Sequence, residues 1–159
     1  MEPGSSLPIE TSERELVITR IFEAPRALVF KAWTDPEMQV QWLGPRGFTG
    51  KILKAAARPG DAYRYYMRDP QGGDHWQQGV VRELIHPERL VFTMTWGDER
   101  GEAKYPETLV TLTFEDLGGK TRMTLHQTGF ESVNSRDQHR EGWTSSFDCL
   151  AEVVERAHA

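Results

Sequence analysis

The sequence predicts an α+β protein in which a curved antiparallel sheet is covered by one long helix. Three observations carry this prediction. The middle of the chain, residues 48–128, is a series of short segments in which apolar and polar residues alternate, and turn residues separate these segments. Two short helical patterns come before it, and one long helical pattern follows it. Strands and helices that are segregated along a chain are typical of α+β folds. Because the sheet's apolar face needs a cover, we expect the long helix to lie across it.

The first strand is expected at residues 15–25, which are rich in β-branched and apolar side chains. Residues 26–33 then place Val29, Phe30 and Trp33 on one helical face, and Pro25 suits the helix start. The residue before a proline avoids helical geometry, so this helix should end at Asp35-Pro36. Asp35 can cap a second short helix that runs to Gly44-Pro45.

Six further strands are expected, separated by glycine- and proline-containing turns, at residues 48–57, 62–68, 75–85, 89–96, 108–116 and 121–128. Their apolar residues alternate with polar ones, as in half-buried antiparallel strands. Residues 89–96 show this pattern most clearly, with Phe92, Met94 and Trp96 on one face and Thr93 and Thr95 on the other. The predicted sheet therefore has about seven strands.

The final helix is expected from about residue 132 to 157. At about 100° per residue, Trp143, Phe147 and Leu150 share an apolar face. Three small residues, Gly142, Ser146 and Cys149, lie beside or within that face. They allow either close packing on the sheet or a space left for another molecule.

Composition narrows the classes of function. The net charge of −5, without a basic stripe, argues against nucleic acid as the main partner. No apolar run is long enough to span a membrane. One cysteine, Cys149, cannot form an internal disulfide, and this suits a reducing cytoplasm. We expect a mobile polar tail over residues 1–14, without a secretion signal, and a single cytoplasmic domain over residues 15–159.

Four segments carry a resemblance to a known family: "TRIFEAPRALVFKAWTDPEMQVQWLGP", "HPERLVFTMTW", "VTLTFEDLGGKTRMTLHQTGF" and "HREGWTSSFDCLAEVV". In this order they are similar to proteins homologous to the activator of heat-shock protein 90 ATPase, within the START-related superfamily that includes the major birch-pollen allergen. The resemblance implies a helix-grip fold, a curved sheet wrapped around a long C-terminal helix, often with an apolar cavity between them. Members are described as ligand carriers, stress or resistance proteins and chaperone regulators.

Residues of the inward faces are the candidate binding site, because apolar pockets with a few polar groups are how proteins hold small molecules. Tyr65, Ser146 or Cys149 would orient the ligand. Trp76 is expected to pair across with the tyrosine face of the preceding strand. The other account is a filled core, which any domain of this size needs. The predicted lining is Tyr65, Trp76, Phe92, Met94, Trp96, Leu112, Phe114, Met123, Trp143, Ser146, Phe147 and Leu150.

No catalytic or metal constellation is evident. The histidines lack ligand spacing, and no fingerprint of a phosphate- or dinucleotide-binding cofactor is present. Glu83, Arg122 and His126 lie on strands without a sign that they converge, and His126 is expected to point away from the cavity. His139 precedes Cys149 by nearly three helical turns, too far to activate it as a nucleophile.

The sequence thus favours a binding protein, monomeric or homodimeric, for a small apolar or aromatic molecule. One alternative is a protein-interaction domain that regulates a chaperone, by analogy with the ATPase activator. The other is an enzyme that uses the same cavity.

Overall fold

The computed structural model describes residues 13–159. Apart from Glu13 and Arg14, the tail expected over residues 1–14 lies outside the described residues. Within residues 13–159, seven antiparallel strands form one curved sheet in the order β1-β7-β6-β5-β4-β3-β2. The strands are β1 (Glu15–Phe22), β2 (Thr49–Lys54), β3 (Ala62–Arg68), β4 (Asp74–Ile85), β5 (Arg89–Gly97), β6 (Thr108–Asp116) and β7 (Thr121–Thr128).

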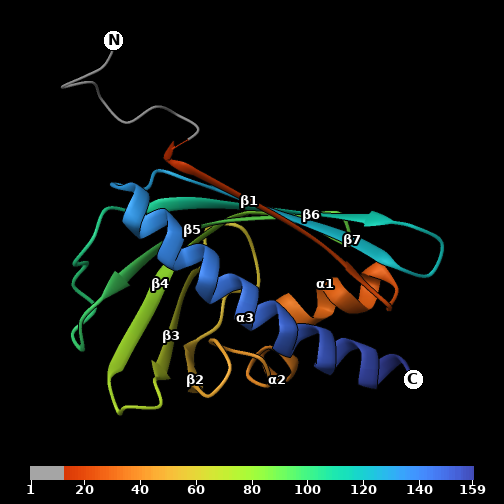
Figure 1. Ribbon diagram of the computed structural model, residues 1–159, viewed down its shortest axis with the longest axis horizontal. Coiled ribbons are helices and arrows are strands. Elements are labelled where there is room, and N and C mark those ends of the chain that lie inside the picture. Colours follow the sequence, from red (N-terminus) through yellow and green to blue (C-terminus); the bar gives the residue numbers. More distant parts are fainter. Residues whose placement is uncertain (1–12) are drawn as a thin grey trace, which may run out of the picture.

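Three helices accompany the sheet in the described part of the chain: α1 (Arg26–Thr34), α2 (Pro36–Gln39) and α3 (Val133–His158). The long helix α3 crosses one face of the sheet diagonally, and α1 and α2 lie near its C-terminal half (Figure 1). This confirms the predicted helix-grip fold. Within residues 13–159, no helix combines the length and apolarity needed to cross a membrane.

The second short helix is shorter than the sequence pattern indicated. The Asp35 side chain does cap it, accepting a hydrogen bond from the Glu37 amide. The regular helix ends at Gln39, and the chain continues through tight turns in which the Trp42 amide bonds the Gln39 carbonyl. The Trp42 indole donates to the Ala32 carbonyl at 3.0 Å. This bond ties the turn segment to α1.

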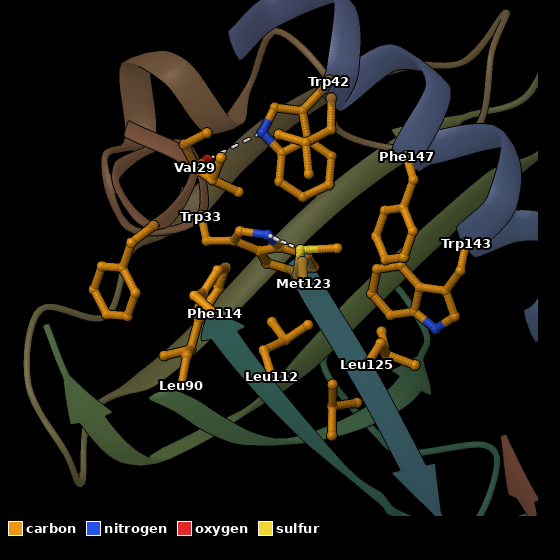
Figure 2. Close-up of a cluster of buried hydrophobic side chains, with 14 of the residues drawn as sticks. Val29, Trp33, Trp42, Leu90, Leu112, Phe114, Met123, Leu125, Trp143 and Phe147 are labelled. Atoms are coloured by element: carbon orange, nitrogen blue, oxygen red, sulfur yellow. Dashed lines mark hydrogen bonds between the residues drawn. The ribbon is translucent and has the colours of Figure 1, made fainter. Parts of the chain in front are cut away.

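Aromatic and aliphatic side chains from every layer fill the main core. Figure 2 shows Trp33 of α1 across its centre, with Trp143 and Phe147 reaching down from α3 and Phe114 rising from the sheet. The Trp33 indole nitrogen donates to the Met123 sulfur at 3.2 Å. The largest side chains with almost no exposed surface are Phe22, Phe30, Phe130, Phe147, Leu16, Leu112, Met123, Leu125 and Leu150.

Strand β5 is buried on both faces, whereas its alternating pattern predicted a half-buried strand. Thr93 and Thr95, on the outer face, are almost as buried as their inward neighbours. The segment after the strand folds back over this face, and the Thr95 hydroxyl donates to the Tyr105 carbonyl at 2.7 Å. Threonine suits such a site because its hydroxyl can be satisfied by the covering backbone.

A close backbone contact bends the sheet between β4 and β5. A Cβ placed at Gly79 would lie 1.9 Å from the Thr93 carbonyl oxygen, so only glycine fits. The Val80 amide bonds the Thr93 hydroxyl at 2.8 Å, and the Tyr63 hydroxyl reaches from β3 to donate to the Thr93 carbonyl at 2.6 Å. A register shift follows between Val81 and Glu83. Irregularities of this kind increase twist and curvature.

A chain of buried hydrogen bonds joins α3 to the sheet. The Trp143 indole donates to Gln127 Oε1 at 2.8 Å, and Gln127 Nε2 donates to the Thr108 hydroxyl at 2.9 Å. That hydroxyl in turn donates to the Met94 carbonyl at 2.9 Å. Gln127 has no exposed surface. The chain therefore fixes the position of Trp143 over β7, β6 and β5.

Candidate functional site

A cavity of about 410 Å³ lies between α3, the inner faces of β3 to β5 and the segment that follows α2. This volume falls within the range of small-molecule sites. Four tryptophans supply much of its wall, with methionines and a few polar side chains between them. The lining residues are Trp33, Trp42, Leu43, Gly44, Pro45, Phe48, Met67, His75, Gln77, Met94, Trp96, Gln138, His139, Gly142, Trp143 and Ser146.

Ring-to-ring contacts hold the aromatic wall in place. Trp33 meets Trp42 edge to face, with ring centroids 4.7 Å apart, and lies 5.9 Å from Trp143. The indole nitrogen of each of these three residues is bonded elsewhere, to Met123, to Ala32 and to Gln127 respectively. Their polar edges are satisfied within the protein. The surfaces that remain for a ligand are therefore mainly apolar ring faces.

Small residues on α3 keep the cavity open on the helix side. Gly142 and Ser146 both line it, and a Cβ at Gly142 would have Pro45 Cγ as its nearest neighbour, at 3.9 Å. Cys149, the third small residue, does not line it. Burial raises the pKa of the Cys149 thiol, and the nearby Arg46 guanidinium opposes that shift only in part. A thiol with a raised pKa is a poor nucleophile.

His139 is the best-defined polar group of the cavity. The Trp96 indole nitrogen donates to its Nε2 at 3.0 Å, while its Nδ1 lies 2.7 Å from the Ser135 carbonyl oxygen and donates to it. Both bonds require the neutral imidazole with its proton on Nδ1. Burial lowers the pKa of His139 below the usual 6.5, which favours this neutral form at neutral pH.

Two other polar side chains reach the cavity from β4. Gln77 is almost fully buried. His75 is about two-fifths exposed, and its Nε2 lies 2.8 Å from Asp69 Oδ2. That hydrogen bond is the largest influence that lowers the pKa of the Asp69 carboxyl. Apart from its two histidines, the cavity wall formed by the described residues has no ionisable side chain, so it suits a neutral ligand.

A second hollow of about 570 Å³ lies beside the first, where α3 begins and β5 ends. Its wall is more polar and includes Asp74, Lys104, Tyr105, Glu131 and Asn134. Five residues border both hollows: His75, Met94, Trp96, Gln138 and His139. Residues that face two spaces form the partition between them. The hydrogen bond from Trp96 to His139 therefore lies in that partition.

The structure distributes the twelve predicted lining residues over several places. Met94, Trp96, Trp143 and Ser146 line the large apolar cavity. Tyr65 and Phe92 border a small cavity of about 40 Å³, closer to α2. Five others lie in the packed core and border none of these three cavities: Leu112, Phe114, Met123, Phe147 and Leu150.

Trp76 is oriented differently from the sequence interpretation. It stands opposite Tyr66 in the register, with ring centroids 5.3 Å apart, while the face of Tyr63 and Tyr65 is inward. The Arg64 guanidinium lies 5.9 Å from the Trp76 ring centroid. Trp76 borders only the second hollow, because Gln77 takes the inward position on this strand.

Sequence reasoning did not place Trp33, Trp42, His75 and His139 at the cavity. Trp33 was expected on the apolar face of its helix, and nothing in the local pattern showed that this face borders a space. His139 falls near the helix start, where only the tertiary fold brings it to Trp96.

The side chains considered for acid–base chemistry do not converge. Glu83 pairs with Arg89 at 3.1 Å, Arg122 with Glu115 at 2.8 Å, and His126 with Glu15 at 2.6 Å. None of them borders either hollow. Across residues 13–159, no three His, Cys, Asp or Glu side chains are grouped so that they could hold a metal ion.

Solved structures with the same architecture come from several bacteria. A protein from Chromobacterium violaceum is 28% identical, with a TM-score of 0.80 over 89% of this chain and 97% of that one. A protein from Silicibacter pomeroyi whose name carries the label AHSA1 is 24% identical, with a TM-score of 0.82 over 91% of this chain and 99% of that one. One from Arthrobacter aurescens is also 24% identical, with a TM-score of 0.83 over 93% and 90% of the two chains. The last two likenesses bear on the fold alone.

The family comparison covers most of the chain. A search among curated proteins finds no match. The profile of one family, described as "Activator of Hsp90 ATPase homolog 1-like protein", matches residues 23–155. This range begins after β1 and includes both hollows and nearly all of α3. The chain therefore belongs to the family of Activator of Hsp90 ATPase homolog 1-like proteins.

Proposed function

We propose that this protein binds a small neutral molecule with an aromatic or apolar body in the cavity between the sheet and α3. The observation that carries this proposal is a tryptophan-walled cavity of about 410 Å³ in which, among the described residues, two histidines are the only ionisable side chains. Residues 15–159 would act as one binding domain. We extend the proposal to a cytoplasmic location, because the single thiol of Cys149 is free.

The wall chemistry supports an aromatic ligand. Flat ring faces of Trp33, Trp42 and Trp143 offer offset-stacked or edge-to-face contacts to another ring. Ser146 and Gln77 supply polar atoms that would orient a hydroxyl or carbonyl group. A charged ligand would have to leave water without a fixed opposite charge in the wall, which is costly.

A thermal-shift screen with a panel of neutral aromatic molecules tests the proposal. At about a hundred times its dissociation constant, a ligand adds about 2.7 kcal/mol of stability. For a chain of this size that is a shift of roughly 5–10 °C in Tm. The panel should include 2-naphthol, and a panel without any dose-dependent shift would refute the proposal.

A matched pair of variants places the binding site. Gly142→Phe puts a ring at the cavity wall, whereas Thr144→Phe puts the same ring on the exposed side of α3. We expect the first variant to lose ligand affinity by at least tenfold and the second to keep it. Equal affinities in the two variants would mean that the ligand binds elsewhere.

Chaperone regulation is the second candidate, favoured by the family description. Strand β1 is an edge strand on which Val17 and Ile21 are about half exposed, at 54% and 49%. Exposed apolar side chains on an edge strand suit contact with another protein. The test is the ATPase rate of heat-shock protein 90 with and without this protein. Stimulation that disappears in a Val17→Glu, Ile21→Glu double variant would favour this candidate.

A further inference from the structure

The two hollows differ in chemistry and share one partition. The first is walled mainly by tryptophan, methionine and other apolar groups. The second has three charged side chains, Asp74, Lys104 and Glu131, together with the amide of Asn134. A ligand that filled both would need an apolar part and a polar part joined at the partition.

We propose that the cavities form one binding site for an elongated amphipathic molecule, with an aromatic part in the first hollow and an uncharged, hydroxyl-rich part in the second. This inference rests on the proposed function, since it names the class of ligand for the same site. The junction would lie at Trp96 and His139, which border both hollows.

The charges of the second hollow argue against an anionic group. Two carboxylates, Asp74 and Glu131, stand against one ammonium group, Lys104. A negatively charged group would be repelled by this balance. Hydroxyl groups, by contrast, can donate to carboxylates and to the amide oxygen of Asn134.

An aromatic side chain gives the second hollow a surface for the less polar face of such a group. Tyr105 lines the hollow and is 55% exposed. Its backbone carbonyl accepts a hydrogen bond from the Thr95 hydroxyl at 2.7 Å, which holds the backbone at this position. An exposed ring in a hollow that also contains carboxylates suits a molecule with alternating C–H and O–H surfaces.

The partition would also contribute to the fit. Trp96 Nε1 and His139 Nε2 satisfy each other at 3.0 Å, so neither is left as a buried, unpaired group when the hollows are empty. A ligand that spans both hollows could place an ether oxygen at the junction. That oxygen would either accept the hydrogen bond from the Trp96 indole N–H in place of His139 or lie beside the bonded pair. Either route puts the link between the two parts of the ligand at Trp96.

Two probes that share the same naphthyl ring system test the inference: 2-naphthol and 2-naphthyl β-D-glucopyranoside. Their dissociation constants for the full chain would be measured by isothermal titration calorimetry. We expect the glucoside to bind at least ten times more tightly than the naphthol. If the naphthol binds and the glucoside binds equally or less tightly, the inference is overturned while the proposed function stands. If neither binds, the inference is overturned, and the thermal-shift panel alone decides whether the proposed function stands.

A pair of variants tests whether the tighter binding of the glucoside comes from contacts in the second hollow or from a gain in affinity unrelated to that hollow. Tyr105→Ala removes a ring that lines only this hollow, whereas Val133→Ala removes a nearby exposed side chain that lines neither. We expect Tyr105→Ala to weaken glucoside binding by at least fivefold and to leave naphthol binding unchanged. Val133→Ala should change neither. Equal glucoside affinities in both variants would refute the placement of the polar part.

Discussion

Replacing Gln127 by methionine should destabilise the protein through one specific group, the indole N–H of Trp143. The two side chains are similar in size, so the core keeps its volume. Gln127 has no exposed surface, and its amide is the acceptor for Trp143 at 2.8 Å and a donor to Thr108 at 2.9 Å. The substitution removes both bonds.

The magnitude follows from what each partner loses. The Thr108 hydroxyl still donates to the Met94 carbonyl, so its loss is small. The Trp143 N–H is buried without another acceptor, and leaving such a donor unpaired costs about 1–3 kcal/mol. We therefore expect Gln127→Met to lower the free energy of unfolding by about 2 kcal/mol. This corresponds to roughly 4–8 °C in Tm for a chain of this size.

Urea unfolding followed by far-ultraviolet circular dichroism measures this loss without relying on tryptophan emission. The same measurement on Trp143→Phe and on the double variant completes a double-mutant cycle. Each single variant leaves one buried polar group unpaired, and the double variant leaves neither. The sum of the stability losses of the two single variants should therefore exceed the stability loss of the double variant by about 1–2 kcal/mol. Additive losses, within about 0.3 kcal/mol, would refute the reasoning. Gln41→Met, at an exposed glutamine, is the control and should change stability by less than about 0.5 kcal/mol.

Three other substitutions test separate features of the structure. Gly142→Ala should raise the free energy of unfolding by about 0.5–1 kcal/mol, because alanine favours the helix and its Cβ has ordinary contact distance, 3.9 Å, to Pro45; a loss of stability in urea would contradict this. Gly79→Ala should cost more than about 3 kcal/mol, since its Cβ would lie 1.9 Å from the backbone oxygen of Thr93; an unchanged urea midpoint would contradict the close contact. The pKa of His139 is lowered in the folded state, so the unfolded chain binds the extra proton and the free energy of unfolding should fall as pH drops below about 6.5. His139→Gln should make the free energy of unfolding depend less on pH between about 7.5 and 5.5. The same pH dependence in the variant and the original protein would refute the assignment of this effect to His139.

The fold could be predicted because its determinants are local. Alternation in β5, β6 and β7, the break at Asp35-Pro36 and the long apolar face of α3 each identify an element within its own segment. Where the prediction differed, a contact from another part of the chain was responsible. The alternating positions of Thr93 and Thr95 predict that the outer face of β5 is exposed. In the structure the segment around Tyr105 covers that face.

The cavity could be predicted only in part, because periodicity assigns a residue to the inner face without showing what fills the space opposite. Met123 and Trp96 are both inward residues on their strands, yet Met123 contacts Trp33 in the core whereas Trp96 borders both hollows. The difference arises from the helices opposite the two strands: Trp33 of α1 donates to the Met123 sulfur, whereas Trp96 meets His139 of α3 at the partition between the hollows. No pattern within β5 or β7 contains that information.

Trp33 explains why the protein has both a filled core and a cavity. Its indole nitrogen is bound to Met123, and its ring lies 6.0 Å from the ring of Phe147, so one side of it belongs to the packed core. Another side lines the apolar cavity with Trp42. A large, rigid ring held by a hydrogen bond cannot relax into the space. Flexible aliphatic side chains in its place would do so. The small residues Gly142 and Ser146 then keep the opposite wall from filling it. The cavity is thus a consequence of where large and small residues are placed.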